Sequence, residues 1–264
     1  MAHLSSPTVI APGIGLLTAD NPSEMTLDGT NSYLLFDPAS SSLEPGTELV
    51  LIDPGPELEA HLQSLAQLQI QLVLITHRHA DHTGGIDRLH QLTGAPVRAK
   101  LAEFCREATT LEDREVIAAA GVSIGVHFTA GHTSDSVCFT MNDSHLFTGD
   151  TVLGRGTTIL EHPDGTLADY LGSLNRLLDL PDMPLHPAHG QQHETSHQLL
   201  RAYLEHRESR LDQVRAALQK LGKAGADVTP AQLLEFVYPD LDPRLVGAAS
   251  RSLEAQLHYL ASNR

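Results

Sequence analysis

The sequence has little of what several common protein classes require. It contains no tryptophan and only two cysteines, and 17 Lys and Arg stand against 33 Asp and Glu, for a formal net charge of −16. Two cysteines cannot build the disulfide framework of a small secreted domain, so we expect Cys105 and Cys138 to be small buried residues. The acidic excess disfavours a large surface that grips phosphate backbones.

Long apolar runs and early basic residues are also absent. No stretch approaches the roughly 18 apolar residues that span a membrane. No Lys or Arg precedes Arg78, so the start of the chain lacks the charged region of a signal peptide and the arginines of a transit peptide. These absences predict a soluble, cytoplasmic protein with no membrane partner.

Short apolar segments bounded by turn residues predict strands through the first two thirds of the chain. They lie at residues 32–36, 48–53, 71–76, 97–99, 126–129, 137–141 and 145–148. Helical periodicity predicts helices at residues 58–68, 84–92 and 101–120. Because hairpins mix with β-α units, we expect an α/β fold of two sheets with helices outside.

The last part of the chain has a different pattern. An apolar helical stripe runs from about Glu194 to Leu221 and ends at Gly222, and Thr229-Pro230 predicts the next helix start. A last helix is expected over residues 244–260. Residues 1–204 hold 9 basic and 25 acidic side chains, whereas residues 205–264 hold 8 of each. We therefore expect two domains, residues 1–204 and an all-helical module at 205–264.

Metal-capable side chains gather in one hexapeptide. His77, His79, Asp81 and His82 lie within six positions, directly after the apolar run 72–75. Imidazole and carboxylate suit zinc and its neighbours, and a strand that ends in them holds their backbone rigidly. A lone histidine is usually a bystander, but this density predicts a metal site.

Three further candidate ligands follow predicted strands and a Gly or Pro. They are His132 after Gly131, Asp150 after Gly149, and His189 after Pro187-Ala188. Each alone is equally consistent with a turn or a cap, and His186 is a rival for the last position. Two metal shells need more than the four side chains of the hexapeptide, so these three are the expected additions.

In this order the motifs resemble the signature of the metallo-beta-lactamase superfamily. The matching residues are His77-x-His79-x-Asp81-His82, Gly131-His132, Gly149-Asp150 and His189-Gly190, with Asp53 in Leu51-Ile52-Asp53-Pro54-Gly55 as the first motif. The resemblance covers residues from about 30 to 190 and implies a four-layer αββα sandwich. Glycine directly after the ligand favours His189 over His186.

The resemblance also implies roles for these residues. His77, His79 and His132 would bind one metal, and Asp81, His82 and His189 the other. Asp150 would bridge both ions, and Asp53 would orient ligand imidazoles. Asp rather than Cys at position 150 resembles the glyoxalase II and ribonuclease Z branches, which disfavours β-lactam hydrolysis.

The ends of the chain resemble one branch, typified by beta-lactamase-like protein 2. The similar segments are residues 21–33, His206-Arg207-x-x-Arg210, Val237-Tyr238-Pro239 and residues 253–260. That branch appends a winged-helix-like module, which the resemblance places at residues 205–264. Because the sequence reaches Arg264 just past the expected recognition helix, we expect the β-wing to be absent or minimal.

A binuclear centre predicts hydrolysis. Two cations about 3.5–4 Å apart lower the pKa of a bridging water from about 15.7 to near 7, so hydroxide is available at neutral pH. The resemblance implies two zinc ions per chain, with iron or manganese as alternatives. Asp81 and Asp150 are the expected catalytic carboxylates.

Three functions stay open. The first is hydrolysis of a small activated acyl compound, a thioester or ester, favoured by the acidic metal domain. The second is cleavage of single-stranded RNA, for which the only plausible basic residues are Arg78, Arg155, Arg207, Arg210 and Arg215. The third is a non-hydrolytic redox role at iron. The oligomeric state is not predicted.

Overall fold

The computed structural model describes residues 5–40, 42–44, 46–222 and 228–262. The chain forms two compact units. The first is made of residues 1–128, 135–156 and 183–195, and the second of residues 129–134, 157–182 and 196–264. The expected boundary at 204/205 falls inside one continuous helix, α5 (Ser196–Leu221), so the division into residues 1–204 and 205–264 stays a prediction.

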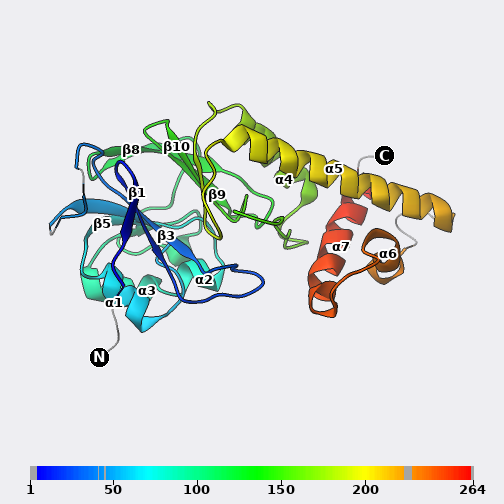
Figure 1. The fold of residues 1–264 in the computed structure, drawn as a ribbon, viewed down its shortest axis with the longest axis horizontal. Coiled ribbons are helices and arrows are strands. Elements are labelled where there is room, and N and C mark those ends of the chain that lie inside the picture. Colours follow the sequence, from blue (N-terminus) through cyan, green and yellow to red (C-terminus); the bar gives the residue numbers. More distant parts are fainter. Residues whose placement is uncertain (1–4, 41, 45, 223–227, 263–264) are drawn as a thin grey trace. The chain divides into compact units, whose positions relative to one another are not determined.

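The first unit contains two sheets, and strands of both are labelled in Figure 1. The strands of the larger sheet follow chain order: β1 (Thr8–Ala11), β2 (Ile14–Thr18), β3 (Asn31–Leu35), β4 (Glu48–Ile52), β5 (Gln69–Leu74) and β6 (Val97–Arg98). β1, β2, β3 and β4 pair antiparallel in that order. β5 pairs parallel with β4 on one side and with β6 on the other. Parallel neighbours need crossover connections. Helices provide them: α1 (Glu59–Leu65), then α2 (Ala80–Thr83) and α3 (Ile86–Thr93).

The second sheet follows almost entirely from hairpins. Its strand order is β11 (Leu185–Pro187), β10 (His145–Gly149), β9 (Val137–Met141), β8 (Val122–Phe128) and β7 (Val116–Ala119). β7 to β10 pair antiparallel, and β11 pairs parallel to β10. The parallel pair brings the ends of β10 and β11 to the same edge of the sheet.

Strand alternation explains how the two sheets pack. In β4, Val50 and Ile52 belong to the same core cluster as Phe139 of the second sheet. The alternate residues Leu49 and Leu51 join the cluster that contains Leu62 of α1. Successive side chains of a strand point to opposite faces, so one face of the larger sheet meets the second sheet and the other meets helices. The predicted α/β class, two mixed sheets with flanking helices, is confirmed.

The second unit is helical. It contains α4 (Leu167–Leu178), α5, α6 (Pro230–Val237) and α7 (Val246–Ser262), shown from green to red in Figure 1. Its core draws on α5, α6, α7 and the residue Val228 before α6; the buried members are Val214, Ala217, Val228, Leu233, Val237, Leu253 and Leu257. No helix in the described part of the chain is long and apolar enough to cross a bilayer.

One predicted element is wrong. Residues 101–120 form no long helix but a short 3-10 turn, Ala102–Phe104, and then strand β7. The Arg98 guanidinium donates to the backbone carbonyls of Thr109 and Thr110 and pairs with Glu115 at 2.9 Å, which holds the segment extended. β7 then forms a hairpin with β8. Tertiary pairing thus overrides the helical charge pattern.

Two helix boundaries predicted near the C-terminus, the end of α5 at Gly222 and the start of α6 at Thr229-Pro230, are confirmed, whereas the last helix, expected over residues 244–260, spans Val246–Ser262 as α7. α6 begins after Thr229 with Pro230 at its first position, and the Thr229 amide donates to Oε1 of Gln232 at 3.0 Å. Gly222, directly after α5, has a φ of 61°, a left-handed conformation that favours glycine.

Candidate metal centre

The metal-capable side chains are carried by the ends of strands. β5 ends at Leu74, and the chain continues through His77 to His79, which precedes the first residue of α2. Asp81 and His82 lie within this single turn of helix. Asp150 directly follows β10, and His189 lies two residues after β11. Because β10 and β11 are parallel neighbours, the last two side chains start from the same sheet edge.

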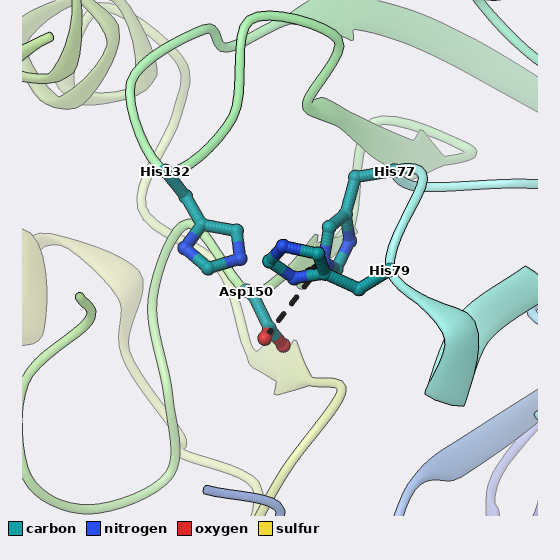
Figure 2. A group of neighbouring side chains, drawn as sticks. All are labelled: His77, His79, His132 and Asp150. Carbon is teal, nitrogen blue, oxygen red and sulfur yellow. Dashed lines mark hydrogen bonds and ion pairs between the residues drawn. The ribbon is translucent and has the colours of Figure 1, made fainter. Parts of the chain in front are cut away.

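A first group of potential ligands consists of His77, His79, His132 and Asp150. One ligand atom from each lies within 4.8 Å of the others, and the side chains point toward one another in Figure 2. Nε2 of His77 and Nδ1 of His79 are 3.0 Å apart. Ligands about 2.0–2.1 Å from a tetrahedral ion are separated by a little over 3 Å, so this spacing suits two ligands of one ion.

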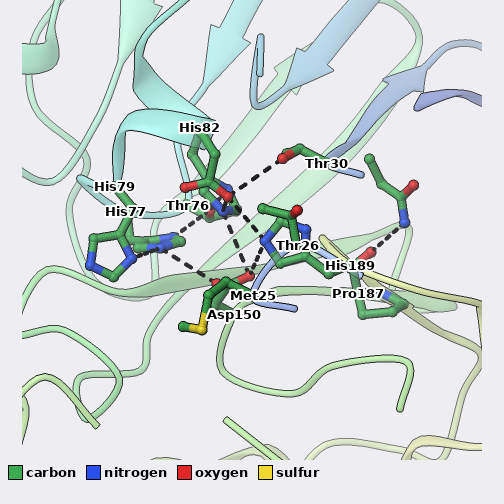
Figure 3. Close-up of polar contacts among 12 residues, drawn as sticks. Met25, Thr26, Thr30, Thr76, His77, His79, His82, Asp150, Pro187 and His189 are labelled. Carbon is green, nitrogen blue, oxygen red and sulfur yellow. Dashed lines mark hydrogen bonds and ion pairs between the residues drawn. The ribbon is translucent and has the colours of Figure 1, made fainter. Parts of the chain in front are cut away.

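A second group consists of Asp81, His82 and His189, again with ligand atoms within 4.8 Å of one another. Nε2 of His189 lies 3.2 Å from Oδ2 of Asp81, and Nε2 of His82 lies 3.4 Å from the same oxygen. Both histidines are buried, and the side chain of Asp81 is 26% exposed. Figure 3 shows His82 and His189 of this group beside Asp150.

Asp150 faces both groups. Its Oδ2 lies 3.9 Å from Nε2 of His77. Its Oδ1 lies 3.2 Å from Nε2 of His189 and 3.6 Å from Nε2 of His82. One carboxylate therefore presents a different oxygen to each group.

Asp53 supports the hexapeptide from the end of β4. Its Oδ1 accepts from the backbone amide of Thr76 at 2.8 Å, and its Oδ2 accepts from the Thr76 hydroxyl at 2.7 Å. Oδ2 also accepts from Nδ1 of His82 at 2.8 Å. Asp53 adopts a φ of 53°, the left-handed region that Asp tolerates better than most residues. The carboxylate is thereby turned back toward the residues that follow β5.

Hydrogen bonds orient the other imidazoles in the same way. Since the Thr76 hydroxyl donates to Asp53, it accepts from Nδ1 of His77 at 3.1 Å. Nδ1 of His189 donates to the carbonyl of Gly29 at 3.1 Å, and Nδ1 of His132 donates to the carbonyl of Ile159 at 2.6 Å. Each donation places the ring proton on Nδ1 and leaves Nε2 as the unprotonated nitrogen of the neutral ring, the state in which imidazole binds a metal.

The charges of the cluster shift its pKa values strongly. Burial raises the pKa of Asp150, but the charges of His189 and His82 outweigh burial and hold that pKa well below its usual range. Burial lowers the pKa of His82, but the carboxylates of Asp53, Asp150 and Asp81 raise it well above its usual value. Burial also lowers the pKa of His189, but the charge of Asp150 outweighs burial and raises this pKa to about 9. The carboxylates thus create a site that favours positive charge.

A metal fits this arrangement. Nε2 of His82 is buried and makes no hydrogen bond to any described residue. Its proton is on Nδ1, so in the neutral ring a lone pair faces carboxylate oxygens of Asp81 and Asp150. Buried lone pairs and carboxylates repel one another unless a cation lies among them. The donor set, imidazole nitrogen with carboxylate oxygen, suits zinc, iron and manganese alike.

His189, and not His186, lies in a potential ligand group. His186 lies outside both groups: its Nε2 is 3.0 Å from Nδ1 of His145, and its ring stacks on Phe147. Burial, and then the nearby His145, lower the pKa of His186 to about 3. Sequence reasoning missed Thr76, which joins Asp53 to His77; its position directly before the first histidine is the only signal that could have indicated it.

Comparisons with known proteins agree with the site. Residues 25–189 match the Metallo-beta-lactamase superfamily. The chain is 32% identical to the "Atrochrysone carboxyl ACP thioesterase" of Aspergillus fumigatus, over 87% of this chain and 75% of that protein. It is 29% identical to the "Beta-lactamase-like protein 2 homolog" of Drosophila melanogaster, over 98% of this chain and 91% of that protein.

A solved structure shares the fold. A beta-lactamase domain protein from Burkholderia ambifaria has a TM-score of 0.79 to this chain at 22% identity, covering 97% of this chain and 88% of its own. The family match over residues 25–189 takes in every residue of the two potential ligand groups. The chain is a metal-dependent hydrolase and belongs to the metallo-beta-lactamase superfamily.

Proposed function

We propose that the chain hydrolyses activated acyl compounds, thioesters or esters, at a binuclear zinc centre. The observation that carries this proposal is the position of Asp150, whose Oδ2 faces His77 and whose Oδ1 faces His82 and His189. A carboxylate with one oxygen toward each of two ligand groups suits a bridge between two ions. A single structural ion would not need it.

The proposed ligand roles follow the two groups. His77, His79 and His132 would hold one ion, Asp81, His82 and His189 would hold the other, and Asp150 would contribute to both. Asp53 fixes His82 and, through Thr76, His77. When bound, the two ions supply Lewis acidity and a hydroxide nucleophile at neutral pH.

Asp81 is the carboxylate placed to contact the attacking water. Asp81 is the most exposed of the three carboxylates, with a side chain that is 26% exposed against 13% for Asp150 and 1% for Asp53. It is placed to accept a hydrogen bond from attacking water as well as to bind metal. The reaction adds water across the acyl bond and releases a carboxylic acid and a thiol or alcohol.

Acyl substrates are supported by a relative and by charge. The Aspergillus fumigatus relative is named a thioesterase. The chain is acidic overall, and several of the arginines considered for RNA are already engaged. Arg215 pairs with Glu208 and Asp212, and Arg207 is only 4% exposed. A groove that tracks single-stranded RNA needs accessible cations with stacking aromatic rings.

For the C-terminal helices we keep the winged-helix-like description as a proposal. α5, α6 and α7 share one core. Residues 228–262 form α6, a short 3-10 turn and α7.

The decisive experiment compares substrates and metals in one preparation. Wild type and Asp150→Ala would be assayed on a short-chain acyl thioester and on a fluorescent single-stranded RNA, after metal analysis. We expect thioester hydrolysis, two zinc ions per chain, and loss of activity in the variant. RNA cleavage without thioesterase activity would replace the acyl proposal, and iron with negligible hydrolysis would favour the redox alternative.

A further inference from the structure

We propose that Arg207 of α5 is a positioning residue for the metal ligand His132. The inference rests on the proposed role of His132 and concerns a side chain 75 positions further along the chain. Both residues belong to the second unit, and the connection between them runs through described hydrogen bonds and one ring contact.

Arg207 lies on the buried stripe of α5. Its neighbours on that stripe are Tyr203, Leu211 and Val214, yet the side chain is charged and only 4% exposed. A buried guanidinium is costly unless it is well satisfied. Its Nε has no hydrogen-bond partner among the described residues. Helix packing alone would be served by an apolar side chain at this position, so the charge needs another explanation.

The guanidinium is tied to the loop that holds His132. One terminal nitrogen of Arg207 donates to the backbone carbonyl of Thr158. The next carbonyl, that of Ile159, accepts from Nδ1 of His132 at 2.6 Å. Two residues further, the amide of Glu161 donates to the carbonyl of His132 at 2.9 Å. Arg207 therefore anchors the segment that fixes both the ring and the backbone of His132.

A second contact connects Arg207, through Tyr170, to Gly131, the residue before His132. The guanidinium carbon of Arg207 lies 4.8 Å from the ring centroid of Tyr170. The Tyr170 backbone abuts Gly131, where an added Cβ would lie 2.4 Å from the Cα of Tyr170. Arg207 thus restrains both the loop and the helix between which the Gly131-His132 turn is held.

Arg210, one turn further along α5, provides a matched comparison. It donates to the backbone carbonyl of Val237 at 3.0 Å and lies 4.5 Å from the ring centroid of Tyr238. The two arginines therefore make the same pair of contacts, a carbonyl and a tyrosine ring. The partners of Arg207 contact His132 or the residue before it, whereas the described partners of Arg210 lie at the end of α6.

The test measures zinc affinity in Arg207→Met and Arg210→Met, by competition with a chromophoric chelator, together with thermal unfolding. Replacing a residue that orients a metal ligand typically lowers metal affinity about 10- to 100-fold. We expect Arg207→Met to bind one of two zinc ions about 10- to 100-fold more weakly and Arg210→Met to keep both affinities. Unchanged affinities in Arg207→Met, or equal losses in both variants, would overturn the inference.

His132→Ala separates this inference from the proposed ligand set. If that variant binds two ions as tightly as wild type, the role of His132 itself fails; if it loses one ion while Arg207→Met does not, only the positioning role fails. Should Arg207→Met not fold, hydrogen exchange of wild type gives the answer. Chelation should speed exchange in residues 157–166 and not in α6, and equal exchange in both states would count against the coupling.

Discussion

Oδ2 of Asp53 lies 2.8 Å from Nδ1 of His82, and neither side chain is more than 1% exposed. The hydrogen bond joins the residue after β4 to the helical turn after β5, so the two parallel strand ends are locked at the metal centre. It also decides which nitrogen of His82 carries the proton. The geometry of a potential metal ligand is therefore set by a residue that belongs to neither ligand group.

Asp53→Asn tests this lock. The amide keeps the shape of the carboxylate but turns an NH2 group toward a buried donor, the Thr76 amide or Nδ1 of His82. We expect the free energy of unfolding to fall by about 1–3 kcal/mol and metal affinity to fall about 10- to 100-fold. Urea denaturation and metal titration measure both. Asp37→Asn, at an exposed position, is the control and should change neither quantity.

Asp150→Asn tests the proposed bridge. The variant keeps one oxygen, so it can serve the His77 side or the His82 and His189 side but not both. We expect one tightly bound ion per chain in place of two, with hydrolysis lost. Metal analysis after exhaustive dialysis gives the stoichiometry, and two ions at wild-type affinity would rule out the bridge.

Gly131→Ala and Gly172→Ala form a pair with opposite expected signs. Gly131 has a φ of 145°, and a Cβ there would meet backbone atoms of Tyr170 at 2.4–2.7 Å, whereas a Cβ on Gly172 in α4 meets nothing within 4 Å. We expect Gly131→Ala to destabilise the protein by about 1–3 kcal/mol. Gly172→Ala should stabilise it by about 0.5–1 kcal/mol, because alanine is the better helix former. Equal urea midpoints for the two variants would contradict the described packing.

His186 predicts a dependence of stability on pH. Its pKa is about 3 in the folded chain, against about 6.5 for an ordinary histidine. Between these values the unfolded state binds the additional proton, so stability falls as the pH drops from about 6.5 toward 3, by up to about 1.4 kcal/mol per pH unit. His186→Phe, which keeps an aromatic ring against Phe147, should have a shallower slope. Urea unfolding between pH 5 and 7 in a chelating buffer compares the slopes, and identical slopes would argue against the assignment.

The potential ligands could be proposed from the sequence, whereas several elements of the fold around them could not. His77 to His82 follow an apolar run, and Asp150 and His189 each follow a short strand, so local pattern alone indicated the potential ligands. Their grouping depends on which strands are neighbours. The parallel pairing of β10 with β11, which brings Asp150 to His189, has no local signature and was not predicted.

The predictions for other parts of the chain were wrong or missing for physical reasons. Residues 101–120 carry a helical charge pattern, but the hydrogen bonds from Arg98 and the pairing of β7 with β8 involve residues outside this segment and decide the outcome. α4 was not predicted, although Thr166 accepts a hydrogen bond from the amide of Asp169 as an ordinary N-terminal cap. The buried charge of Arg207 was also invisible, because an arginine in an amphipathic helix normally faces solvent.

The potential ligands extend from His77 to His189, and they belong to strand ends in both sheets. An unfolded chain cannot hold all of them around a pair of ions, because the sheets must first assemble. Ions that bind only the assembled state stabilise the native protein and leave an early folding transition state almost unchanged. Bound metal would therefore slow unfolding and lengthen the lifetime of the folded chain, while the folding rate would stay nearly the same.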